Sequence, residues 1–156
     1  AEGIKDAVEK FTGAGRRFEF LGEYDGFMLA DDYAHHPTEI KATLSAAKEL
    51  DYNNVIAVFQ PFTFSRTALL KDDFIKALSI ADKVILTPIM GSREKNTYGI
   101  KSEDLAAGLH DVCVVDGFEN IADKIEEIAH PGDLVITMGG GDIYKAAHII
   151  QGRHAK

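Results

Sequence analysis

The sequence predicts an α/β fold, a doubly wound and mostly parallel sheet flanked by helices, with an antiparallel hairpin near its amino terminus. Short apolar runs typical of buried strands occur at residues 55–59, 84–86, 112–115 and 134–137. Between them lie stretches of helical character, near residues 65–80, 102–109, 119–129 and 142–150. Apolar strands that alternate with helices indicate a parallel sheet covered on both faces.

Two further elements are expected before this alternation begins. Apolar residues three and four positions apart predict a short helix over residues 2–11. The dipeptide Asp25-Gly26 separates runs at 16–21 and 26–30, which is a strong hairpin signal. We therefore expect one antiparallel strand pair at an edge of the sheet, and a single domain over residues 1–156.

Composition limits the class of protein. The chain has 156 residues, of which 46 % are hydrophobic, but no apolar run is near the roughly 18 residues that suggest a membrane span. Its first residues lack a signal-peptide pattern. The single cysteine, Cys113, cannot form an internal disulfide and favours a reducing compartment, so we expect a cytoplasmic protein. A net charge of −8 argues against a nucleic-acid surface.

Residues 31–39 form the most distinctive stretch, with the sequence Asp-Asp-Tyr-Ala-His-His-Pro-Thr-Glu. An apolar strand precedes it, and a helix is predicted after it from apolar positions at Ile40, Leu44 and Ala47. Pro37 suits the first turn of that helix. Ligands in α/β proteins usually bind at such strand-to-helix junctions. A capped polar loop is the alternative, but two carboxylates beside two imidazoles favour a binding site.

Other polar segments follow two more of the predicted parallel strands. Arg66 comes shortly after residues 55–59, and Gly139, Gly140 and Gly141 come after residues 134–137. The carboxyl ends of parallel strands share one edge, so Asp32, His35, Arg66 and the glycines are predicted to converge.

Each of these segments has a structural and a functional interpretation. Arg66 near a helix start is disfavoured by the helix dipole, so it forms a surface salt bridge or captures a carboxylate or phosphate. The three glycines are either a tight turn with Asp142 as the helix cap, or a loop whose amides bind an anion. Arg16 and Arg17 are either solvated strand residues or phosphate contacts.

Several familiar sites are not supported. The glycines match neither a P-loop nor Gly-x-Gly-x-x-Gly, because position 144 is Tyr, and no serine lies in a nucleophile elbow. A zinc site at residues 31–36 is disfavoured because adjacent residues of an extended segment point to opposite faces. The remaining histidines are expected to be solvated; these are His110, His130, His148 and His154.

Three segments together resemble the carboxyl-terminal domain of the Mur ligases, the ATP-dependent amino-acid ligases of bacterial peptidoglycan synthesis. They are residues 31–39, residues 59–67 with Phe-Gln-Pro and Ser-Arg-Thr, and residues 138–142 with Met-Gly-Gly-Gly-Asp. Residues 16–18 resemble the junction at which this domain begins. Within the family, the pattern is most similar to the branch that joins L-alanine to UDP-N-acetylmuramate.

The resemblance implies one third of a three-domain enzyme, whose other domains hold the P-loop, most of the Mg²⁺ contacts and UDP-N-acetylmuramate. Asp32, Arg17 and Tyr33 would then bind ATP, with Asp32 on the ribose and Arg17 facing the phosphates. His35 and Arg66 would bind L-alanine. The fragment alone would be inactive, and no metal ligands are assigned to it.

Two departures and two alternatives accompany the resemblance. Many relatives have His at the position of Phe62 and Arg at that of Thr63, so this chain would hold the amino acid with fewer polar groups. A related branch, which attaches a ready-made tripeptide to the same sugar nucleotide, shares much of the first motif. A non-catalytic nucleotide- or anion-binding module of the same fold is the alternative from another class.

Overall fold

In the computed structural model, which describes residues 19–91 and 95–154, six strands form one sheet in the order β1-β2-β6-β3-β4-β5. Each pair is parallel except β1–β2, which is antiparallel. The strands are β1 (Glu19–Tyr24), β2 (Phe27–Asp32), β3 (Val55–Phe59), β4 (Lys83–Leu86), β5 (Val112–Val114) and β6 (Leu134–Met138). The predicted fold class and the edge hairpin are confirmed.

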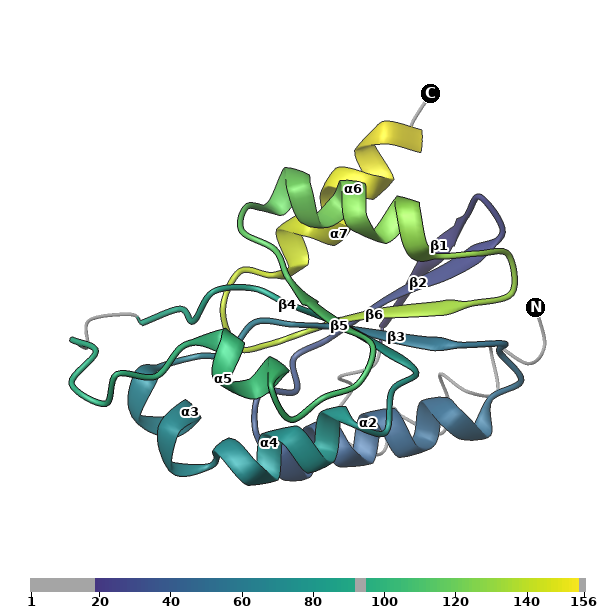
Figure 1. Ribbon diagram of the computed structural model, residues 1–156. Helices are drawn as coiled ribbons and strands as arrows, with labels where there is room; N and C mark the ends of the chain where they lie inside the picture. The colour runs from purple at the N-terminus through teal and green to yellow at the C-terminus, as the bar shows by residue number, and fades with distance from the viewer. Residues whose placement is uncertain (1–18, 92–94, 155–156) are drawn as a thin grey trace.

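Helices cover both faces of the sheet (Figure 1). On one face lie α2 (Pro37–Glu49), α3 (Phe64–Leu69), α4 (Lys71–Leu78) and α5 (Ser102–Ala106). On the other lie α6 (Phe118–Ile128) and α7 (Tyr144–His154). Alternate residues of each central strand enter two separate apolar clusters, one under each layer. None of these helices is long and apolar enough to cross a membrane.

The hairpin turns at the predicted dipeptide. Asp25 and Gly26 have φ angles of 50° and 89°, and Tyr24 pairs with Phe27, so these are the two loop residues. A side chain at position 26 would also clash with Pro131, since a Cβ there would lie 2.7 Å from the proline Cβ. The turn therefore depends on glycine for both its conformation and its packing.

One predicted helix, over residues 65–80, is divided in the structure. Helices α3 and α4 meet at Leu70, whose φ and ψ of −110° and 19° are not helical. The division buries Phe74 against Phe59, with ring centroids 5.5 Å apart, while Leu69 stays 74 % exposed. Packing thus overrides the local helical pattern. The helix predicted over residues 2–11 lies outside the described residues.

Candidate functional site

Asp31 and Asp32 end β2, and residues 33–36 connect it to α2 at the carboxyl edge of the parallel strands (Figure 1). Asp31 and Asp32 point to opposite faces of the sheet, because they occupy successive positions of β2. Asp32 bonds Thr43 on α2, whereas Asp31 bonds Thr137 on β6. The two carboxylates therefore cannot bind one ion together.

Asp32 is buried, with 2 % of its surface exposed. Its Oδ1 accepts a hydrogen bond from the Ala34 amide at 2.7 Å, and its Oδ2 accepts one from the Thr43 hydroxyl at 2.9 Å. These bonds fix the turn that leads to His35. An ionised carboxylate has about four acceptor positions, so a buried carboxylate of this kind can accept more than these two hydrogen bonds.

Asp31 is partly buried on the other face. Burial raises the pKa of its carboxyl above the ordinary value of 3.8, and a 2.7 Å bond from the Thr137 hydroxyl offsets this only in part. The ionised form is therefore less favourable in the folded chain than in the unfolded chain.

This shift predicts a stabilising substitution. A group with a raised folded pKa contributes stability below its unfolded pKa and loses it as the pH rises through the folded pKa. Asp31→Asn keeps an acceptor for Thr137 without the charge, so it should raise the free energy of unfolding at neutral pH. Chemical denaturation across acidic to neutral pH should show the gain shrinking toward pH 3.8. A gain that is independent of pH would contradict the assigned cause, and Thr137→Val should destabilise the chain instead.

His35 is held by its own loop. Its Nδ1 lies 3.0 Å from the Tyr33 carbonyl oxygen and 3.5 Å from the Glu39 carboxylate, and both neighbours are acceptors. The proton of a neutral His35 therefore belongs on Nδ1, which leaves Nε2 as an acceptor. The Tyr33 ring packs edge-on at 5.3 Å and is 60 % exposed. Tyr33 thus presents its ring to solvent beside His35.

Glu39 links the same loop to the first turn of α2. Its Oε1 accepts the amides of His35 at 3.2 Å and His36 at 3.3 Å. His36 is the N-cap residue, so Glu39 supplies the acidic half of a capping box. The motif therefore fixes its own conformation as well as displaying polar groups.

The glycine turn after β6 is held closed by Gln60. The Gln60 Oε1 accepts the Ile143 amide at 3.1 Å, and its Nε2 donates to Asp142 at 3.0 Å. A Cβ on Gly141 would lie 2.5 Å from Oε1, and Gly139 has a φ of 152° close to the Gln60 backbone. Asp142 therefore helps to hold the turn closed through its hydrogen bond with Gln60. Close packing against Gln60 explains why positions 139 and 141 are glycine.

Gly140 brings the turn to the first motif. A Cβ at this position would lie 3.2 Å from Cγ of His35. In the described part of the chain, the amides of Gly140 and Gly141 donate no hydrogen bond. The structure thus unites His35 with the glycine turn and leaves two N–H donors beside it.

Arg66 lies at the same edge, on α3, but none of its described contacts joins it to Asp32, His35 or the glycine turn. Within the described residues its guanidinium makes no hydrogen bond or ion pair. Helix α3 has only six residues and ends three residues after Arg66. The helix dipole therefore does not strongly disfavour a cation at this position, contrary to the expectation from sequence. The free guanidinium is the stronger reason to regard Arg66 as a binding residue.

Thr63 has a role that its sequence position did not reveal. It caps α3, accepting the Arg66 amide on its hydroxyl at 3.3 Å, and adopts a φ of 65° that is uncommon for a β-branched residue. Thr43 and Gln60 were also missed as supporting residues. Their partners are distant in sequence, so no local pattern could have found them.

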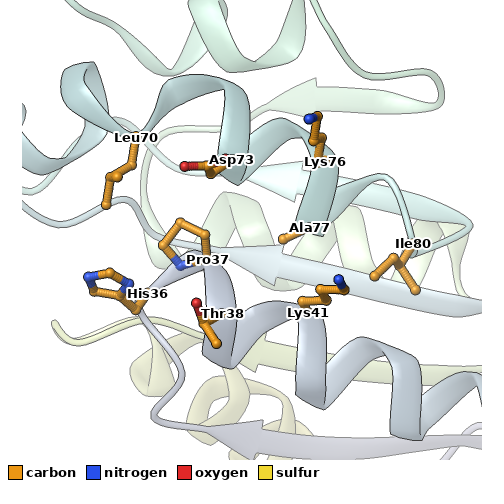
Figure 2. Close-up of a pocket in the computed structure, with 9 residues that line it drawn as sticks. All are labelled: His36, Pro37, Thr38, Lys41, Leu70, Asp73, Lys76, Ala77 and Ile80. Carbon is orange, nitrogen blue, oxygen red and sulfur yellow. The ribbon is translucent and has the colours of Figure 1, made fainter.

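A groove lies beside this edge and not within it. It has a volume of about 480 Å³ and lies between α2 and α4. Figure 2 shows His36 at one end of the groove and Ile80 at the other. Lys41 and Lys76 flank it. Of the proposed ligand-binding residues that the structure describes, none lines this groove. Arg17 lies outside the described residues.

Comparisons with known proteins give the family. Residues 16–141 match the family described as Mur ligase, glutamate ligase domain. A UDP-N-acetylmuramate–L-alanine ligase from Caldicellulosiruptor saccharolyticus is 50 % identical over 151 residues, which are 94 % of this chain and 33 % of that protein. The chain thus spans about a third of the length of the curated relatives that it matches.

Solved structures share the fold. The UDP-N-acetylmuramate–alanine ligase of Thermotoga maritima matches with a TM-score of 0.68 and 22 % identity, over 98 % of this chain and 37 % of that one. A folylpolyglutamate synthase/dihydrofolate synthase from Yersinia pestis, complexed with AMPPNP and Mn, matches with a TM-score of 0.63 and 21 % identity. The match covers 88 % of this chain and 31 % of that one. Sequence and fold agree, and the chain belongs to the Mur ligase family.

Proposed function

We propose that residues 1–156 are the carboxyl-terminal domain of a three-domain UDP-N-acetylmuramate–L-alanine ligase, a cytoplasmic enzyme of peptidoglycan synthesis. The 50 % identity to a protein of that name supports this assignment. The observation that carries the site is the contact of His35, in the nine-residue motif, with Gly140 of the glycine turn. We propose neither a nucleic-acid nor a membrane partner.

The proposed reaction forms an amide through an acyl phosphate. A carboxylate oxygen of UDP-N-acetylmuramate attacks the γ-phosphorus of ATP, and ADP leaves. The neutral amine of L-alanine then attacks the acyl carbon, phosphate leaves, and the amine loses a proton. This chain would position ATP and L-alanine. It would raise the reaction rate by placing the amine accurately against the acyl carbon.

In this proposal, Asp32, Tyr33 and Arg17 bind ATP. The buried Asp32 carboxylate accepts a ribose hydroxyl, the exposed Tyr33 ring lines the nucleotide pocket, and Arg17 faces the phosphates. The amides of Gly140 and Gly141 suit an anionic oxygen because they have no acceptor in the described part of the chain.

L-Alanine would lie between His35 and Arg66. The planar guanidinium of Arg66 can donate two parallel hydrogen bonds to the amino-acid carboxylate. The Nε2 of His35 can accept a proton from the amino group, because Nδ1 faces the Tyr33 carbonyl. Together they would hold both ends of the amino acid.

Mg²⁺ would neutralise charge on the transferring phosphoryl group. Oxygen ligands suit this ion, but Asp31 and Asp32 project from opposite faces of the sheet and both accept hydrogen bonds. We therefore propose that the central domain of the enzyme supplies its main protein ligands.

Activity assays of the complete enzyme and the isolated chain test this proposal. With ATP, Mg²⁺ and UDP-N-acetylmuramate, the complete enzyme should release phosphate when L-alanine is added, and this chain alone should release none. Release with the tripeptide but not L-alanine would identify the related branch. If the gene lacks an upstream Gly-rich loop with Lys-Thr or Lys-Ser and the complete protein has neither activity, a non-catalytic binding module replaces the ligase.

A further inference from the structure

A second polar cluster lies across the molecule from the proposed substrate site, where the β1–β2 turn approaches the ends of α6 and α7 (Figure 1). Asp25 belongs to the turn, Glu126 to the last turn of α6, and His154 to the end of α7. His154 was expected to be a solvated residue, but its side chain is only 28 % exposed. Three separate elements thus place potential metal ligands together.

The three side chains already have the spacing of a metal site. The His154 Nε2 lies 3.2 Å from a Glu126 oxygen and 3.6 Å from an Asp25 oxygen, and all three ligand atoms lie within 4.8 Å of one another. With zinc–ligand bonds of about 2.0–2.2 Å, tetrahedral geometry separates neighbouring ligand atoms by about 3.3–3.6 Å. Two of the three separations therefore suit the ion with little rearrangement.

We propose that Asp25, Glu126 and His154 form a binding site for a divalent transition-metal ion of the Zn²⁺ type. One imidazole nitrogen and two carboxylate oxygens form a donor set that such ions accept, with water in the remaining position. Asp25 is 66 % exposed, which leaves the site open to an ion from solvent. Because the ligands come from three elements, the ion would join the hairpin to both helices.

The surrounding charge favours a cation. Arg153 bonds one oxygen each of Glu119, Asp123 and Glu126, which leaves the second oxygen of Glu126 facing His154. Three carboxylates thus surround the Arg153 guanidinium, and Asp25 adds a fourth carboxylate beside His154. Glu126 and His154 also lie at the carboxyl ends of their helices, where the helix dipoles stabilise positive charge.

Tyr24 gives the imidazole a defined orientation. Its ring packs against His154 with centroids 5.2 Å apart and planes inclined by 42°. Its hydroxyl faces the Leu21 carbonyl oxygen at 3.4 Å, which helps to fix the tyrosine side chain. The histidine is thus oriented before an ion binds.

An ion-pair network without a metal is the competing explanation, and Zn²⁺ binding separates the two. Protonation of His154 strengthens its pairing with Asp25 and Glu126, whereas a metal requires the neutral imidazole. A network of ion pairs alone would therefore give no specific Zn²⁺ binding, whereas a metal site would bind the ion saturably.

Titration of the full 156-residue chain with Zn²⁺ tests the proposal after chelator treatment and buffer exchange. Calorimetry should give one ion per chain, and the thermal midpoint should rise with Zn²⁺ concentration. Asp25→Asn and His154→Ala should each weaken binding by about tenfold or more, because even outer-shell changes cost 10–100-fold. Asp25 lies in an exposed turn, so its variant tests the site with little risk to the fold.

Two substitutions serve as matched controls. His148→Ala removes another histidine of α7, and Cys113→Ser removes the thiol; both should retain the wild-type affinity. Co²⁺ can be used as a spectroscopic probe, and its complex with the wild-type chain should absorb visible light intensely, as four-coordinate Co²⁺ does. The His154→Ala variant should not show this absorption. Absence of saturable Zn²⁺ binding, or equal affinity in Asp25→Asn, His154→Ala and the controls, would overturn the proposal.

Discussion

Arg66→Ala in the complete enzyme is expected to raise the KM for L-alanine sharply while changing the KM for ATP much less. Loss of one member of a desolvated charge pair costs about 2–5 kcal/mol. The effect should lie toward the upper end, because Thr63 is neutral and serves as the cap of α3. Within the described residues the Arg66 guanidinium also has no hydrogen-bond or ion-pair partner, so a substrate anion would be its main contact.

Arg66→Lys should already be damaging, since an ammonium cannot reproduce the planar pair of donors. The measurement is steady-state kinetics with L-alanine varied at saturating ATP and UDP-N-acetylmuramate. Lys71→Ala, which removes a nearby cation at the start of α4, is the matched control and should leave both constants unchanged. An unaltered alanine KM in a folded Arg66→Ala enzyme would remove this residue from the site.

Asp32→Ala should have two separable effects. Its carboxylate accepts two short bonds in a buried position, from Ala34 and Thr43, and a hydrogen bond to a charged group contributes about 1.5–3 kcal/mol. The substitution should therefore lower the free energy of unfolding by about 3 kcal/mol. If Asp32 also binds the ribose, the KM for ATP should rise about ten- to a hundredfold, and more than that for L-alanine.

Thr43→Val separates these two effects. It removes one of the two bonds to Asp32 but leaves the carboxylate, so it should lower stability by only about 1–2 kcal/mol. Its KM for ATP should stay near the wild-type value. Denaturation curves combined with ATP kinetics of both variants make the comparison. Equal increases in the ATP KM for Thr43→Val and Asp32→Ala would show that Asp32 acts by positioning the loop and not by binding ATP.

The location of the candidate site followed from the sequence. Strands that alternate with helices require crossover connections, so polar segments after strands 27–30, 55–59 and 134–137 share one edge. This argument placed His35 and Gly140 close together, and in the structure a Cβ on Gly140 would lie 3.2 Å from the His35 Cγ. Local signals were equally sufficient for the hairpin, because Asp25 and Gly26 suit its positive φ angles.

The supporting contacts could not be predicted in the same way. Gln60 lies 83 residues from Ile143, yet its amide group fixes the glycine turn. Asp25 and His154 likewise meet only because the hairpin and α7 lie at the same end of the sheet. The break at Leu70 depends on the fit of Phe74 against Phe59, which competes with a continuous helical pattern.

The sequence by itself determined the α/β class, the edge hairpin, the shared strand edge and the family resemblance, because each depends on periodicity or on residues near one another in the chain. Only the tertiary structure decided which side chains are held and which are free. The Asp32 carboxylate is buried and accepts two hydrogen bonds, whereas the Arg66 guanidinium makes none within the described residues. The physical reason is that hydrogen bonding and burial depend on partners brought by packing from distant parts of the chain.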